Sequence, residues 1–176
     1  MEKLYLQHPS IEHKEQYEEM MTEWEIFGGR LNPRALGRYS QAQQRNIEYE
    51  KWLKWMDEDR ESCQDLFFLM QGNKILGAIS LRYKCAGIHG HVAYGIRPSE
   101  RKKGYASKML ELALPVVKGY GHNPIIISCA KENVASAKVI INNRGILVEE
   151  VANEDSGEIT QIYHICASEL RRGETN

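Results

Sequence analysis

Residues 97–107, RPSERKKGYAS, place a proline-led turn, a run of basic side chains and a glycine directly before a segment of helical character. A strand, a glycine turn and a helix in this order bring backbone N–H groups and the positive end of the helix dipole to one point. Such a point binds anions, phosphate above all. Gly104 and the small Ala106 let a ligand approach the backbone closely. The stretch predicts a phosphate-binding loop, with a solvated basic helix end as the alternative for these residues alone.

The glycine spacing separates this loop from two common phosphate-binding motifs. It has neither the GxxxxGKS/T spacing of a P-loop nor the GxGxxG spacing of a dinucleotide-binding turn. Residues 101–106, RKKGYA, instead fit the pattern Arg/Gln-x-x-Gly-x-Gly/Ala. This pattern resembles the coenzyme A pyrophosphate loop of the GNAT acetyltransferase superfamily. The hydrophobic-x-Pro approach at residues 96–98 and the helix that follows strengthen the resemblance.

A second segment, residues 131–136 (KENVAS), resembles the Asn-x-x-Ala/Ser element of the same family. Asn133 can donate and accept hydrogen bonds at once, which suits an amide-rich pantetheine arm. It suits a helix N-cap equally well. The family's order of strands and helices is followed from about residue 66 to residue 167, so the resemblance covers nearly the whole chain and is weakest before Asp65.

The resemblance implies an α+β fold, the GNAT fold, with a central mixed, mostly antiparallel sheet of about six to seven strands flanked by about four helices. It implies one domain over residues 1–176, with an acetyl-CoA-binding core at about 66–150 and helices at about 11–60 on the acceptor side. It further implies transfer of an acetyl group from acetyl-CoA to a primary amine. A small-molecule amine is the expected acceptor, and protein lysine or N-terminal amines are alternatives.

By the same resemblance, three groups of residues hold acetyl-CoA. The backbone of the strand before the loop pairs with the pantetheine arm, the loop and first helical turn hold the pyrophosphate, and the start of the next helix contacts the arm. These residues are Tyr94, Gly95 and Ile96; Arg101, Lys102, Lys103, Gly104, Tyr105, Ala106 and Ser107; and Asn133 and Ser136.

The catalytic residues depart from the family's pattern. Many members carry a tyrosine seven residues after the asparagine, as the acid for the departing thiolate, and here that position is Ile140. The glutamate that some members carry before the loop falls at Gly90, flanked by His89 and His91, either of which can act as a base at neutral pH. A structural role for both histidines is the alternative. Glu132 is a third candidate, placed to orient an amine.

Two other functions stay open on the sequence alone. The missing tyrosine favours an acyl-CoA-binding module without turnover. The basic residues Arg97, Arg101, Lys102 and Lys103 are compatible with a binder of nucleic acid or phosphoprotein. The H-x-H spacing of the two histidines has no evident third ligand, so no metal is expected.

Composition limits the partners. Lys and Arg number 23 against 24 Asp and Glu, so net charge gives no reason to expect nucleic acid or an anionic membrane. The N-terminus, MEKLYLQHPS, lacks the pattern of a secretion signal, and no apolar run approaches the roughly 20 residues that span a bilayer. We expect a cytoplasmic protein whose partners are acetyl-CoA and an amine. The oligomeric state stays open, with a homodimer among the alternatives.

Hydrophobic periodicity predicts the elements that must position these residues. It predicts strands at 3–6, in a hairpin at about 66–84, before Pro98, at 124–130 and in two last segments, and helices at about 11–27, 41–59, 103–117 and 133–144. Aromatic residues concentrate in the first two helices and the segment between them, where they either line an acceptor pocket or form the core. They are Trp24, Tyr39, Tyr49, Trp52 and Trp55.

Overall fold

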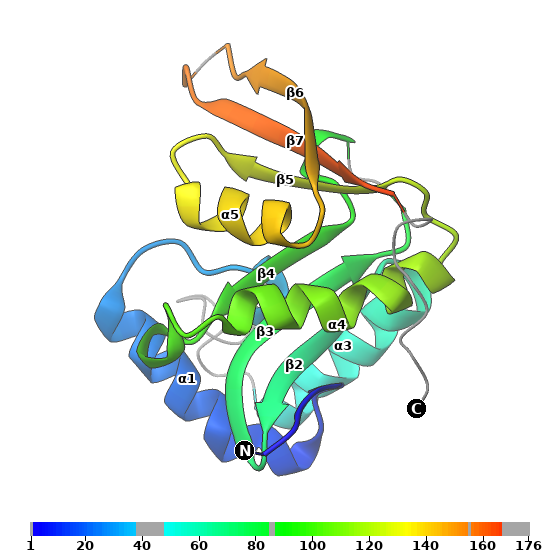
Figure 1. Ribbon diagram of the computed structural model, residues 1–176. Coiled ribbons are helices and arrows are strands. Elements are labelled where there is room, and N and C mark those ends of the chain that lie inside the picture. The colour runs from blue at the N-terminus through cyan, green and yellow to red at the C-terminus, as the bar shows by residue number, and fades with distance from the viewer. Residues whose placement is uncertain (1, 38–47, 85–86, 155, 167–176) are drawn as a thin grey trace. The chain divides into compact units, whose positions relative to one another are not determined.

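The computed structural model describes residues 2–37, 48–84, 87–154 and 156–166 (Figure 1). Over these residues the chain forms seven strands and four α-helices, in agreement with the α+β class. The chain divides into two compact units, residues up to 81 with 93–109, and residues 82–92 with those from 110 onward. No helix of the described part is both long enough and apolar enough to cross a bilayer.

The first unit is built on a four-stranded sheet of order β1-β2-β3-β4. Strand β1 (Leu4–Gln7) runs antiparallel to β2 (Gln64–Gln71), and β2 turns into β3 (Lys74–Arg82). Gly72 has φ 55°, a left-handed value that suits the tight turn predicted between these strands. Strand β4 (Val92–Ile96) is the last of the four, so one of its edges faces no strand of this sheet.

Helices α1 (Lys14–Phe27) and α3 (Tyr49–Ser62) supply the core of this unit. The rings of Tyr17 and Trp52 lie 4.8 Å apart between centroids, and those of Tyr49 and Trp52 lie 5.2 Å apart. Tyr49 and Trp52 are fully buried, so these two aromatic residues form core rather than an acceptor pocket. Tyr39 and residues 41–47 of the predicted second helix lie outside the described residues.

Helix α4 (Tyr105–Gly119) follows the basic loop. It begins two residues later than periodicity predicts and continues past Pro115 to Gly119. Pro115 lies on the exposed side of the helix.

The second unit holds a three-stranded antiparallel sheet of order β5-β7-β6. Its strands are β5 (Ile125–Ala130), β6 (Ile146–Ala152) and β7 (Ile159–Ile165), and helix α5 (Val134–Asn142) packs beside β5 (Figure 1). The residue in left-handed conformation after α5 is Arg144, with φ 67°. Position 145 requires glycine because it packs against Ile140: a Cβ there would lie 2.3 Å from Cγ2 of Ile140.

Candidate active site

The loop between β4 and α4 presents backbone N–H groups at a helix start. Lys102 and Gly104 have left-handed φ values of 63° and 83°. Helical hydrogen bonding begins with the N–H of Lys108 and the carbonyl of Gly104, 3.3 Å apart, so the N–H groups of Tyr105 and Ala106 have no acceptor inside the helix. A Cβ built on Gly104 meets no described atom within 4 Å. The loop thus offers backbone donors at a helix start, with open space beside Gly104, as anion-binding helix N-termini do.

The basic side chains of the loop are largely engaged by the protein itself. Arg101 donates from Nε to the carbonyl of Ile96 at 3.1 Å, and burial lowers the pKa of its guanidinium. Lys103 donates to Glu100 at 2.8 Å, while Lys102 is exposed. Backbone N–H groups are therefore the main donors that this loop can offer an anion.

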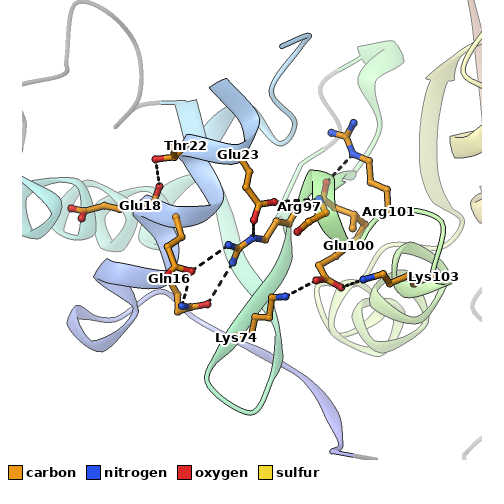
Figure 2. Close-up of polar contacts among 12 residues, drawn as sticks. Gln16, Glu18, Thr22, Glu23, Lys74, Arg97, Glu100, Arg101 and Lys103 are labelled. Carbon is orange, nitrogen blue, oxygen red and sulfur yellow. Dashed lines mark hydrogen bonds and ion pairs between the residues drawn. The ribbon is translucent and has the colours of Figure 1, made fainter. Parts of the chain in front are cut away.

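Glu100 anchors the turn in front of the loop. Its side chain is only 7% exposed and accepts hydrogen bonds from Lys74 of β3 and from Lys103 (Figure 2). Burial opposes ionisation of Glu100, but the hydrogen bonds from Lys103 and Lys74 outweigh it, so its pKa lies below the ordinary value. A buried carboxylate between two ammonium groups fixes the 3₁₀ turn Pro98–Glu100 against the sheet.

Arg97 ties the approach to the loop to helix α1. Its guanidinium, 6% exposed, donates to Glu23 at 2.7 Å and to Glu19 at 3.3 Å, and Glu23 also accepts from the N–H of Ser99 at 3.2 Å (Figure 2). Burial opposes ionisation of Glu23, but the hydrogen bonds from Ser99 and Arg97 lower its pKa overall. Sequence reasoning missed this role, since it counted Arg97 among basic residues available to a polyanion. The buried guanidinium instead faces carboxylates of its own chain.

An open groove runs along α1 beside this contact. Carboxylates predominate in it, so it attracts cations rather than polyanions. Its lining residues are Glu15, Glu18, Glu19, Thr22, Glu23 and Arg97.

The edge of β4 that faces away from β3 carries the backbone predicted to meet the pantetheine arm. Arg97 donates its N–H to Leu76 of β3 at 2.9 Å, so the carbonyl of Ile96, in the same peptide unit, faces away from β3. The carbonyl of Tyr94 accepts from Nδ2 of Asn32 at 2.9 Å. A Cβ on Gly95 would lie 2.0 Å from the carbonyl oxygen of Asn32, so position 95 admits glycine alone.

The second unit holds Asn133 and Ser136. The side-chain oxygen of Asn133 accepts from the N–H of Ser136 at 3.1 Å and caps α5, the alternative considered for this asparagine. Burial raises the pKa of the neighbouring Cys129 thiol, against the opposing effect of its hydrogen bond with Ser136. Glu132 is exposed. Ile140, at the position of the family's tyrosine, is fully buried.

His91 is buried and is held in place by a hydrogen bond and by ring stacking. It is 5% exposed, its Nδ1 accepts from the N–H of Ile126 at 2.9 Å, and its ring stacks on His122 with centroids 3.7 Å apart. Burial, together with the charges of His122 and Arg82, lowers its pKa to about 4. The imidazole is therefore neutral at pH 7 and a weak base. His89 is exposed in the 3₁₀ turn Gly87–His89. Among the described residues, no three His, Cys, Asp or Glu side chains gather in a metal-binding arrangement.

The lowered pKa of His91 predicts acid sensitivity. The unfolded chain takes up this proton near pH 6.5, whereas the folded protein does so only near pH 4. Stability is therefore fully present above pH 6.5 and falls as the pH drops toward 4, by about 2 kcal/mol between pH 7 and pH 5. His91→Asn, whose oxygen can still accept from Ile126, is expected to reduce this loss in urea unfolding at both pH values. His89→Gln is the matched control, and an equal reduction in that variant would contradict the assignment.

Comparison with known proteins identifies the family. A sequence model of the acetyltransferase (GNAT) domain matches residues 3–144. Among solved structures, an acetyltransferase from Salmonella typhimurium that modifies the N-terminal serine of a 50S ribosomal subunit protein has a TM-score of 0.69 at 14% identity, over 93% of this chain and 94% of that one. No match was found among curated protein sequences.

Two further solved structures contain a bound cofactor. Spermidine N-acetyltransferase from Vibrio cholerae, in complex with CoA and spermine, has a TM-score of 0.65 at 11% identity, over 95% of this chain and 97% of that one. A microcin self-immunity acetyltransferase in complex with acetyl-CoA and AMP has a TM-score of 0.64 at 14% identity, over 93% and 92%. These likenesses confirm the GNAT fold expected from the loop motif. The chain belongs to the GNAT family of acetyl-CoA-dependent N-acetyltransferases.

Proposed function

We propose that this enzyme transfers the acetyl group of acetyl-CoA to the primary amine of a small molecule, by direct attack in a ternary complex. The observation that carries the proposal is the backbone of residues 101–107. Left-handed residues at 102 and 104 precede a helix start whose N–H groups lack helical acceptors, and space above Gly104 is open. The pyrophosphate of acetyl-CoA is the anion that fits these donors.

The remaining binding residues are assigned to the pantetheine arm of acetyl-CoA. The open edge of β4 at Tyr94–Ile96 takes the pantetheine arm as an added strand, through main-chain hydrogen bonds. Asn133 and Ser136 contact the arm from the start of α5. Acetyl-CoA supplies an activated thioester, so the chain has to bind it, orient it and manage protons.

The reaction needs a base for the amine proton and a proton source for the departing thiolate. His89, His91 and Glu132 are the candidate bases for the amine, and the lowered pKa of about 4 makes His91 a weak proton acceptor at pH 7. Ile140 is a buried aliphatic residue and donates no proton. The thiolate of coenzyme A is a tolerable leaving group and takes its proton from water.

The acceptor is assigned as an amine because solved neighbours act on amines. One modifies an N-terminal serine, and another is a spermidine N-acetyltransferase. Both acetyltransferases transfer the acetyl group to a nitrogen atom, so the same class of acceptor is proposed for this chain. A protein lysine or N-terminal amine is the alternative acceptor.

The test is thiol release from acetyl-CoA in the presence of a panel of primary amines, with lysine-containing and free N-terminal peptides included. We expect saturable release with at least one small amine and weaker release with the peptides. Calorimetry with acetyl-CoA runs in parallel. Tight binding without release for any acceptor would overturn the enzymatic proposal in favour of an acyl-CoA-binding module, and preferred release with peptides would overturn the small-molecule acceptor.

A further inference from the structure

The indole of Trp24 carries a buried hydrogen-bond donor without an acceptor in the described part of the chain. Trp24 lies on α1 and is 5% exposed, and its Nε1 is buried and unpaired there. Other aromatic donors of this core are satisfied, since Tyr17 donates to the carbonyl of Leu36 and Trp52 to that of Ala35. A buried donor that has left water without gaining an acceptor costs stability. Such a group calls for a functional explanation.

The donor lies on the edge of the ring that faces β4. A Cβ built on Gly95 would lie 3.2 Å from Cζ2 of Trp24. Nε1 and Cζ2 are bonded to the same ring carbon, so the N–H belongs to the same edge of the indole. Because position 95 is glycine, this residue places no side chain between the indole edge and the strand backbone.

The groups around the indole also contact the open edge of β4. Asn32 donates to the carbonyl of Tyr94 at 2.9 Å, and Arg101 donates to that of Ile96 at 3.1 Å. The guanidinium of Arg101 lies 5.6 Å from the centroid of the Trp24 ring. Arg101 is also the first residue of the loop proposed to hold the pyrophosphate. A ligand that occupies the loop and the edge of β4 therefore meets the side chain that lies over the indole.

We propose that the indole N–H of Trp24 donates a hydrogen bond to the acetyl carbonyl oxygen of acetyl-CoA. This inference rests on the proposed function, which places the pantetheine arm, and the acetyl group at its end, along β4. When the amine nitrogen forms the C–N bond, the carbonyl electron pair moves onto this oxygen, where the N–H meets the developing charge. Collapse breaks the C–S bond, the electron pair leaves with sulfur, and the nitrogen loses its proton to a base. One positioned donor of this kind changes kcat by about a hundredfold or more.

Trp24→Phe tests the proposal, because it removes the N–H and keeps an aromatic ring. The readouts are the affinities for acetyl-CoA and for CoA by calorimetry, kcat, and unfolding in urea. We expect acetyl-CoA affinity to fall about fivefold to tenfold while affinity for CoA, which has no acetyl carbonyl, is unchanged. We expect kcat to fall about a hundredfold. Stability without ligand is expected to fall less than in Trp52→Phe, because removal of an unpaired donor offsets part of the cost of the cavity that the smaller ring leaves.

Trp52→Phe is the matched control. It removes an N–H that donates to Ala35 at 3.3 Å, so it should lower stability without changing the ratio of the two affinities. If Trp24→Phe does not fold, position 24 can carry benzothienylalanine, a tryptophan isostere with sulfur in place of the N–H, with the same expected results.

Equal losses of affinity for acetyl-CoA and CoA would overturn the proposal and leave Trp24 as a packing residue. An unchanged affinity ratio with a change only in the KM of the amine would also overturn it. In both cases the unaltered protein still binds acetyl-CoA, so the proposed function stands. Failure of the unaltered protein to bind either ligand would instead overturn the proposed function, and the inference with it.

Discussion

Gly104→Glu is expected to lower the affinity for acetyl-CoA by about a hundredfold or more, which corresponds to roughly 2.7 kcal/mol. Gly104 has φ 83°, where any L side chain is strained by about 1–2 kcal/mol. A carboxylate at this position also fills the open space over the loop N–H groups and repels a pyrophosphate. Loss of this space and charge repulsion act on the bound state, whereas the backbone strain lowers the stability of the free and bound protein alike; the fold has room for the side chain. Calorimetric titration with acetyl-CoA measures the loss.

A matched control exists on the loop between β6 and β7. Gly157 has φ 70°, and a Cβ there also meets no described atom within 4 Å. Gly157→Glu therefore adds the same charge and similar backbone strain away from the proposed site, and it should leave acetyl-CoA affinity unchanged. Gly104→Ala fills part of the open space over the loop with a methyl group but adds no charge, so it should show an intermediate loss. Unchanged affinity in Gly104→Glu would show that the loop is wrongly assigned.

Arg97→Met is expected to reduce the free energy of unfolding by about 2–4 kcal/mol, since it leaves partly buried carboxylates without their cation. Glu23, 29% exposed, loses its 2.7 Å partner, while Glu19, 57% exposed, is relieved by water and contributes less. The turn before the loop is also released, because Glu23 holds the N–H of Ser99. Urea unfolding at pH 7 measures the loss.

A double-mutant cycle separates this contact from general packing. Glu23→Gln in the Arg97→Met background removes the uncompensated charge and should recover part of the stability. Arg60→Met is the control, because its ion pair with Asp57 is exposed on both sides and is worth about 0–1 kcal/mol. Strict additivity of the two substitutions at 97 and 23 would contradict the assigned contact.

The sequence predicted the elements and the loop because both are local features. Apolar periodicity and turn residues located the strands and helices to within a few residues, and the loop motif lies within a dozen residues. The residues that follow α5 were not predictable in this detail, since Arg144 adopts the left-handed conformation and Gly145 lies close to Ile140. The acetyl-CoA residues, the single domain and the homodimer stay predictions.

Contacts between distant segments were not predictable from one sequence. Arg97 and Glu23 are separated by 74 positions, and nothing local distinguishes their charges from those of solvated side chains. The contact of Asn32 with Tyr94 and the approach of Trp24 to Gly95 depend in the same way on tertiary packing. One sequence signal did exist for burial of Arg97, because this cation lies between the apolar residue that ends a strand, Ile96, and Pro98.

The open edge of β4 has a consequence for solubility. An unpaired strand edge can pair with another chain and start aggregation, and natural sheets protect such edges. An edge proposed to receive a strand-like ligand cannot be covered by a permanent neighbouring strand. In this protein two side-chain donors, from Asn32 and Arg101, occupy its outward carbonyls. Side chains can be displaced by a small ligand one bond at a time, yet they interrupt the continuous backbone pairing on which a growing aggregate depends.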